Sequence, residues 1–178
     1  MATKKVTQVV LDEVFDSKEC RHYLNGKLNV LHCHHYATLY TQLADDCTML
    51  DAKKLLAECA EDAFYAALSS YYEAHGLTSV VDRIAIAEEY YAVTGLGKME
   101  VKFLGAEGGA VELVHSHVDE GWIKKWGKRD EPVNFLGSGY IAALFAAVLG
   151  KQPRSFDVKE TACIVSGADK SEFVVAAN

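Results

Sequence analysis

The chain has 178 residues, half of them hydrophobic, and its 25 acidic residues outnumber its 18 lysines and arginines, which gives a formal net charge of −7. This length and apolar content suit one globular domain with its own core, which excludes a disordered or fibrous protein. The negative charge argues against a general attraction to nucleic acid or anionic lipid, so we expect no nucleic-acid partner.

The sequence shows no targeting or membrane segment. Its longest apolar run, residues 140–149, is about half of the ~20 residues that a membrane-spanning helix needs. The first residues lack the apolar block of a secretory signal, and the five cysteines form no CxxC pair, as is typical of reduced thiols. We therefore expect a cytoplasmic protein that makes no membrane contact.

Helical periodicity begins near residue 29. Asn29 follows an Asn25-Gly26 turn and is a suitable N-cap for a first helix. One face of this predicted helix carries residues at the 4-3-4 spacing of an amphipathic helix: His32, Tyr36, Leu39 and Leu43.

Two further helices are predicted in the first half of the chain. One covers about residues 49–75 and stops at Gly76, and the next begins at a Ser79 cap and closes at Gly95. We expect the longer of the two to bury these residues or their neighbours: Leu55, Cys59, Phe64 and Leu68.

The hydrophobic period then changes from helical to alternating. Residues 99–103 alternate between apolar and charged residues, as in a half-buried strand, and the glycines of residues 105–109 supply a turn. The next strand alternates as well, and we expect its inward set to continue an apolar stripe into two histidines: Val111, Leu113, His115 and His117.

The last third predicts a central helix and a second hairpin. Pro132 introduces an almost wholly apolar helix over residues 133–149, in which Gly137 and Gly139 allow another backbone to approach. Strands at about residues 156–165 and 172–176 follow.

The predicted fold is therefore α+β, with a helical N-terminal half and an antiparallel sheet of two hairpins separated by a central apolar helix. We expect residues 1–178 to form a single small-molecule-binding domain. It divides into an N-terminal arm (1–28), a helical half (29–95) and a hairpin-helix-hairpin half (96–178).

Histidines are the most informative polar residues. His32 and His35 lie one turn apart on the first predicted helix, and two histidines separated by one residue on a strand share a face. Imidazoles gathered in this way either bind a transition metal such as zinc or iron, or hydrogen-bond a polar ligand. The candidate catalytic residues are His115, His117 and Glu120.

Glu160 is in phase with the apolar residues of its strand, which predicts a buried carboxylate. Such a group must be paired, hydrogen-bonded, protonated or metal-bound. The candidate metal ligands are therefore His32, His35, His115, His117 and Glu160. We expect no nucleotide cofactor, because no complete dinucleotide fingerprint or P-loop is present.

Part of the sequence resembles a known family. The small-residue run from Asn134 to Ala143, the Glu160-x-x-Cys163 pair, Gly167 and Phe173 are similar to the 4-vinyl-reductase-type domain. The resemblance covers about the last 80 residues, and it implies a small-molecule- or hydrocarbon-binding domain with the fold of TRAPP subunits.

The same resemblance implies more about the site. In the sensor domains of aromatic-responsive bacterial regulators, a zinc held by Cys and Glu residues supports a phenol pocket. Glu160 and Cys163 match two of those ligands, whereas Ser171 replaces the later cysteine and no cysteine lies between Cys59 and Cys163. The resemblance further implies a homodimer through the helical half.

Two functions are compatible with these observations. The first is a carrier or sensor that holds a small, partly aromatic or apolar molecule in an internal pocket. We expect that pocket to be lined by Tyr36, His115, His117, Trp122, Trp126, Phe135 and Tyr140. The second is an enzyme that uses the histidines and Glu160 to bind a metal or to transfer protons on that molecule.

Overall fold

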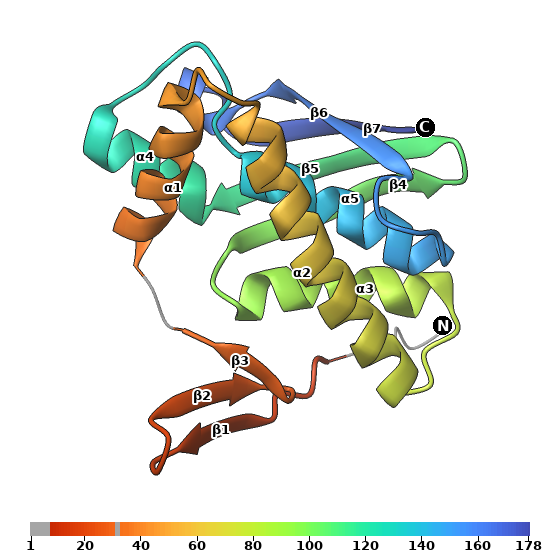
Figure 1. Cartoon of the computed structure of the whole chain (residues 1–178). Coiled ribbons are helices and arrows are strands. Elements are labelled where there is room, and N and C mark those ends of the chain that lie inside the picture. The colour runs from red at the N-terminus through yellow and green to blue at the C-terminus, as the bar shows by residue number, and fades with distance from the viewer. Residues whose placement is uncertain (1–7, 31–32) are drawn as a thin grey trace.

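The computed structural model describes residues 8–30 and 33–178 (Figure 1). A small antiparallel sheet of three strands, called here the N-terminal sheet, comes first, and three helices follow it. The strands are β1 (Glu13–Asp16), β2 (Arg21–Leu24) and β3 (Lys27–Asn29), and the helices are α1 (His34–Asp46), α2 (Ala52–Ala74) and α3 (Val80–Val93).

The main sheet has four antiparallel strands in the order β4-β5-β7-β6. Two hairpins build it, and they join through the pairing of β5 with β7. The α+β fold class is thereby confirmed. The elements of this half are β4 (Gly97–Gly105), β5 (Gly108–Ser116), α4 (His117–Trp126), α5 (Phe135–Leu149), β6 (Phe156–Ala162), a 3-10 turn (Ile164–Ser166) and β7 (Ser171–Ala177).

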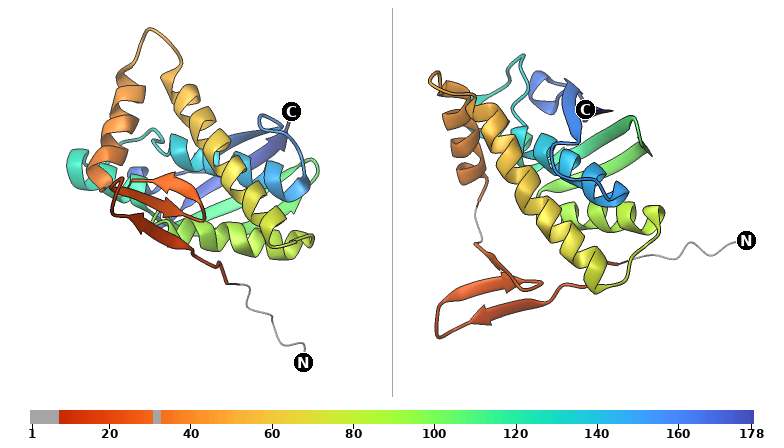
Figure 2. Two further views of the ribbon diagram at one scale, coloured as in Figure 1. Left: turned by 60° about the horizontal axis from the view of Figure 1, so that its bottom comes forward. Right: turned by 45° about the vertical axis from the view of Figure 1, so that its right-hand side comes forward.

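The core is organised around α5. Residues 139–148 of this helix are all buried, because the helix packs on β6 with one side and on α2 and α3 with the others. Figure 2 shows α2 crossing over α5 on the side away from the sheet. The predicted central apolar helix is confirmed, although it begins at Phe135 after an Asn134 cap.

The first helix begins later than predicted. Asn25 and Gly26 have φ of 48° and 72° and form the β2–β3 turn, so the residues that follow pair back as β3. Asn29 ends that strand, and α1 starts at His34 after Cys33. His32 lies outside the described residues. The Ser79 cap of α3 is confirmed, since its side chain accepts a hydrogen bond from the Asp82 backbone N–H.

Irregularities in the β4–β5 pairing change which side chains face the core. Met99 pairs with Leu113, but Lys98 pairs with His115, so the β5 chain carries one extra residue at this point. Ser116 is therefore buried where the alternation predicted His115, and His115 points to solvent. A second shift between Val101 and Phe103 likewise leaves Phe103 64% exposed.

Helix α1 presents its large apolar side chains to solvent. The side that packs on the rest of the chain consists of small residues, Ala37, Thr38, Thr41 and Ala44. The predicted stripe is present on the opposite side, where the exposed residues are Tyr36, Leu39, Tyr40 and Leu43. The first turns of α2 also expose residues that were predicted to be buried. Leu55 and Cys59 are exposed, whereas Leu68, further along the helix, is fully buried as predicted.

The N-terminal sheet projects from the body of the molecule (Figures 1 and 2). The segment before it is tied to the body where the Val9 N–H donates to Glu89 Oε2 and the Val10 N–H donates to the Tyr71 hydroxyl, each at 2.8 Å. Among the described residues, no helix is both long and apolar enough to cross a membrane.

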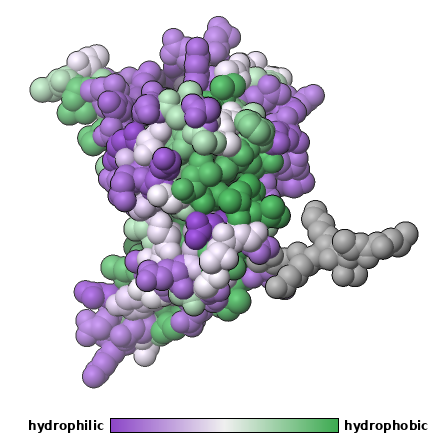
Figure 3. All heavy atoms as spheres, turned by 90° about the vertical axis from the view of Figure 1, so that its right-hand side faces the viewer, coloured by the Kyte–Doolittle hydropathy of each residue, from purple (hydrophilic) through white to green (hydrophobic). Residues whose placement is uncertain are grey.

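Besides the exposed apolar stripe of α1, the molecule has a further apolar area on the side viewed in Figure 3, where apolar residues gather and polar residues surround them. The start of α3 and the β4–β5 turn reach this side in Figure 1. Val80 and Val81 at the start of α3 are 44% and 74% exposed.

Candidate functional site

A groove of about 560 Å³ opens between α2, α5 and β6, and we call it the α2–β6 groove. Its floor is apolar and comes from all three elements. The floor residues are Ala57, Phe135, Gly139, Ala142 and Val158.

Close packing of α2 on α5 shapes this floor. A Cβ atom on Gly139 would lie 2.1 Å from the carbonyl oxygen of Ala57, so only glycine permits this approach. The close backbone approach predicted for Gly139 is confirmed.

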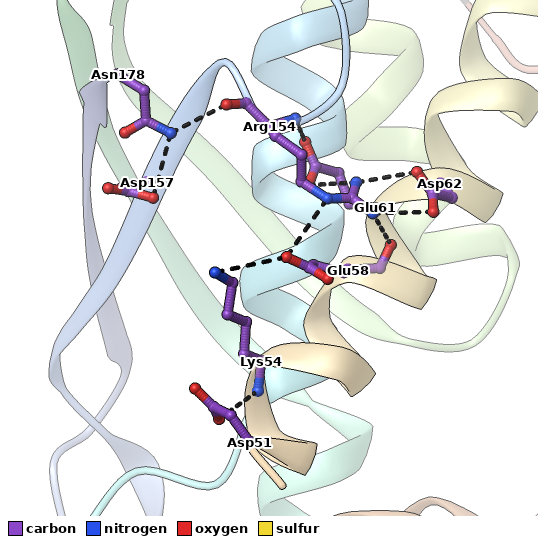
Figure 4. A network of polar contacts seen from close by, with 8 residues as sticks. All are labelled: Asp51, Lys54, Glu58, Glu61, Asp62, Arg154, Asp157 and Asn178. Atoms are coloured by element: carbon purple, nitrogen blue, oxygen red, sulfur yellow. Dashed lines mark hydrogen bonds and ion pairs between the residues drawn. The ribbon is translucent and has the colours of Figure 1, made fainter.

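Arg154 closes one end of the groove with a network of paired charges (Figure 4). Its guanidinium donates to Glu61 at 2.8 Å and to both carboxylate oxygens of Asp62 at 2.9 Å. Its backbone N–H also donates to Glu61 at 2.7 Å, and this holds Arg154 in a left-handed conformation with φ of 69°. The side chain of Asn178 secures the same loop by donating to the Arg154 carbonyl.

Lysines from the start of α2 lie along the rest of the rim. Lys53 Nζ is 2.7 Å from Asp45 and 5.7 Å from the centre of the Phe135 ring, while Lys54 lies 3.8 Å from Glu58. Each basic side chain of the rim thus contacts at least one carboxylate, and these charges surround an apolar floor. An arrangement of this kind favours an uncharged apolar or aromatic ligand over a strongly charged one.

A second notable site is a group of polar residues at the end of the main sheet, buried except for the half-buried Glu160. We call it the carboxyl cluster: Ser116, Asp119, Asn134, Glu160 and Ser171. The Asn134 amide donates to Asp119 Oδ2 at 3.0 Å and to Ser116 Oγ at 2.9 Å. The Ser171 side chain lowers the pKa of both carboxyl groups, and its hydroxyl oxygen accepts a hydrogen bond from the Ile164 N–H at 3.1 Å. Within the described chain, Asp119 Oδ1 and Glu160 Oε1 have no hydrogen-bond partner.

Burial dominates the electrostatics of this cluster. It raises the pKa of Glu160 to about 8, and the nearby charge of Asp119 adds to the rise. Burial also raises the pKa of Asp119, although hydrogen bonds from Ser116 and Asn134 oppose the change. The expectation that Glu160 faces inward is confirmed.

The two histidine segments meet in space through His34 and His117. His34 at the start of α1 lies 6.2 Å, ring to ring, from His117 at the start of α4. Partial desolvation and the neighbouring His35, Lys124 and His117 lower the pKa of His34. His115 instead lies on the surface, where its side chain is 70% exposed and 3.5 Å from Glu120.

The described members of the predicted metal set do not gather into one site. Within residues 8–30 and 33–178, no three His, Cys, Asp or Glu side chains are arranged to hold a metal ion. Cys163 is buried in a small apolar cluster with Trp122, Val133 and Val165.

Of the aromatic residues predicted to line one pocket, Phe135 lines the α2–β6 groove. Tyr140 is fully buried in the core, where its hydroxyl donates to the Ala87 carbonyl. The two tryptophans of α4 differ in exposure, since Trp122 is buried and Trp126 is 52% exposed. Tyr36 is exposed on α1.

Sequence reasoning missed the residues that build the groove rim and most of the carboxyl cluster. Glu61 and Arg154 are 93 positions apart, and no local pattern connects them. Ser116 and Asn134 did carry a signal, because each is a capping residue just before a helix.

No protein-family model matches the sequence, and no curated protein matches it at a significant level. Solved structures do share the fold. The phenol-responsive sensory domain of the transcription activator PoxR, solved with phenol, has a TM-score of 0.76 and 16% identity over 93% of this chain and 84% of its own.

Two further structures are similar. A vinyl-4-reductase family protein from Methanocaldococcus jannaschii has a TM-score of 0.51 and 15% identity over 81% of this chain and 77% of its own. Subunit 3 of the trafficking protein particle complex from Naegleria fowleri, covalently bound to palmitic acid, has a TM-score of 0.54 and 14% identity over 82% of this chain and 94% of its own. The chain thus has the fold that its C-terminal motifs predict, that of a vinyl-4-reductase family protein and a TRAPP subunit.

Proposed function

We propose that the chain binds a small, partly aromatic or apolar molecule in the α2–β6 groove and acts as a carrier or sensor of that molecule. The observation that carries this proposal is the apolar floor enclosed by a rim of paired charges. The groove volume of about 560 Å³ falls within the range of small-molecule sites.

The comparisons support the ligand class. The PoxR sensory domain was solved with phenol, and the Naegleria fowleri subunit is bound to palmitic acid. Both ligands are mainly apolar. In this chain, the ring of Phe135 offers a flat surface to an aromatic ligand, and the small side chains of Ala57 and Ala142 leave room above the floor.

Filling the groove tests the proposal. Val158 lines it from β6, so Val158→Trp should occupy the ligand volume and weaken binding of phenol or a medium-chain fatty acid by about tenfold or more. Isothermal titration calorimetry measures the affinity, and thermal shift of the same samples confirms that the variant is folded.

Val174→Trp is the matched control. Val174 lies on β7, and its strand neighbour Val175 pairs with Val158, so Val174 faces the opposite side of the sheet and is 51% exposed. Binding by the control should equal that of the wild type. Equal binding by Val158→Trp, or no binding of either ligand class by the wild type, contradicts the proposed site.

We further propose that the chain forms a homodimer through its helical half. The outward stripe of α1 supports this, because Leu39, Tyr40 and Leu43 are 42%, 47% and 59% exposed on one side of one helix. A contiguous exposed apolar stripe is typical of an interaction site. Sedimentation equilibrium should give twice the chain mass of 19.5 kDa, and a single-chain mass at micromolar concentration contradicts this proposal.

A further inference from the structure

We propose that the N-terminal sheet of one copy packs on the outward face of α1 of the second copy. This inference rests on the homodimer proposed above: it keeps α1 of the helical half as one surface and adds the N-terminal sheet as the other. Each copy contributes both surfaces, so a two-fold dimer makes the contact twice.

The N-terminal sheet needs a covering surface. Its strands have four, four and three residues, and Val14, Tyr23 and Leu28 pair across them in one row. Side chains paired across strands lie on the same face of a sheet, so this row is an apolar face. Val14 and Leu28 are 47% and 59% exposed in the single chain. A sheet this small gains stability when such a face is packed against another element.

Helix α1 offers the complementary surface. It turns its small residues toward its own chain and its large apolar ones outward, the reverse of an ordinary surface helix. Leu39, Tyr40 and Leu43 lie within about one turn on the outward side of the helix and form a compact apolar area.

The two surfaces do not cover each other within one chain. Residues 30–33 join β3 to α1, and the sheet extends away from the helix (Figures 1 and 2). The other end of the sheet is tied to α2 and α3 through Val10 and Val9, so turning the sheet onto its own α1 would break those bonds. A second copy reaches the same surfaces without breaking them.

The exposed apolar area is sufficient for a stable dimer. The large apolar side chains on this face of the sheet and on α1 together expose roughly 650 Å², within the range that each partner contributes to a standard interface. The contributors to this area are Val14, Leu28, Leu39, Tyr40 and Leu43, together with Val30.

Single substitutions on either surface test the contact. Leu43→Asp on α1 and Leu28→Asp on β3 each place a charge in the proposed interface twice per dimer, so each should raise the dimer dissociation constant by about 100-fold or more. Val81→Asp is the matched control, because Val81 is an exposed apolar residue at the start of α3 and belongs to neither surface. Sedimentation equilibrium reads the mass, and circular dichroism melting confirms that the body of each variant is folded.

Mixing the two variants shows which surfaces meet. A heterodimer of Leu43→Asp with Leu28→Asp contains one contact in which both surfaces are wild type, whereas each variant alone contains none. The mixture should therefore recover part of the dimer that neither variant forms by itself. Differential tagging and co-purification detect this heterodimer.

Each alternative result has a distinct meaning. Dimers that survive both variants but dissociate in Val81→Asp would overturn the inference and move the interface to the start of α3. Monomers in both variants without recovery on mixing would also overturn it, because that pattern belongs to a contact between like surfaces. A wild-type monomer contradicts the proposed homodimer itself.

Discussion

Glu160 and Asp119 show how carboxyl groups shielded from water can make the stability of the fold depend on pH. Neither carboxyl has a lysine or arginine among the groups that shift its pKa, so desolvation is the largest influence on both. A carboxyl whose pKa is raised on folding holds its proton more tightly in the folded chain than in the unfolded one. Unfolding then releases protons over the interval between the two pKa values.

The sign of the pH dependence follows directly. The pKa of Glu160 is about 8 in the folded chain against an ordinary value of 4.5, so its ionisation favours the unfolded state as pH rises from about 4.5 to 8. The free energy of unfolding should fall across this window. Glu160→Gln removes the ionisation, so the variant should lose most of the slope and gain on the order of 3 kcal/mol over the wild type at pH 8. Urea denaturation at pH 5, 6.5 and 8 measures the effect.

Glu172→Gln serves as the control for this series. Glu172 lies on the neighbouring strand β7 with its side chain 47% exposed near Lys170, so its replacement should keep the wild-type slope. A Glu160→Gln profile parallel to the wild type would show that Glu160 does not hold the proton.

Sequence reasoning at this scale identified Glu160 because strand periodicity depends on neighbouring residues alone. Its neighbours Asn134 and Ser171 are brought in from other elements, so no local pattern connects them to Glu160. For His115 the same periodicity predicted the wrong face of the sheet, because the extra residue in β5 is set by pairing with β4. A bulge of this kind leaves no distinct local signal when the surrounding alternation continues.

At the scale of elements, the order of helices and strands and the central position of α5 followed from hydrophobic pattern. The caps and the small residues of α5 carried this information. The orientation of α1 did not follow, because an apolar stripe indicates a buried face but not which chain buries it. The small residues on the opposite side of α1 pack within the chain instead.

The contact between α2 and α5 gives a sharp test of element packing. Gly139→Ala places a methyl group 2.1 Å from the Ala57 carbonyl oxygen and 2.8 Å from the Ala60 Cβ, so the two helices must separate. We expect the free energy of unfolding to fall by about 2 kcal/mol or more. The adjacent Ser138→Ala loses only one hydrogen bond, to the Asn134 carbonyl, and should cost about 1 kcal/mol or less. Equal losses in urea denaturation would show that the helices do not depend on this approach.

At the scale of the whole molecule, buried and exposed apolar surface are distributed unevenly. The body surrounds α5 with a continuous core, whereas the N-terminal sheet and α1 keep large apolar residues exposed. This imbalance implies different local stabilities, since a segment with few buried contacts opens at low free energy. If a second copy supplies the missing contacts, the stability of that segment depends on protein concentration.

Amide hydrogen exchange followed by mass spectrometry distinguishes these regions within one sample. Peptides from β1–β3 should exchange quickly at nanomolar chain concentration and slow by about tenfold or more at concentrations that saturate the dimer. Peptides from α5 are the internal control, because their protection comes from the core of one chain and should not change with dilution. Exchange in β1–β3 that is slow at every concentration would mean that the N-terminal sheet is stable within a single chain, and its apolar row would then need no second copy.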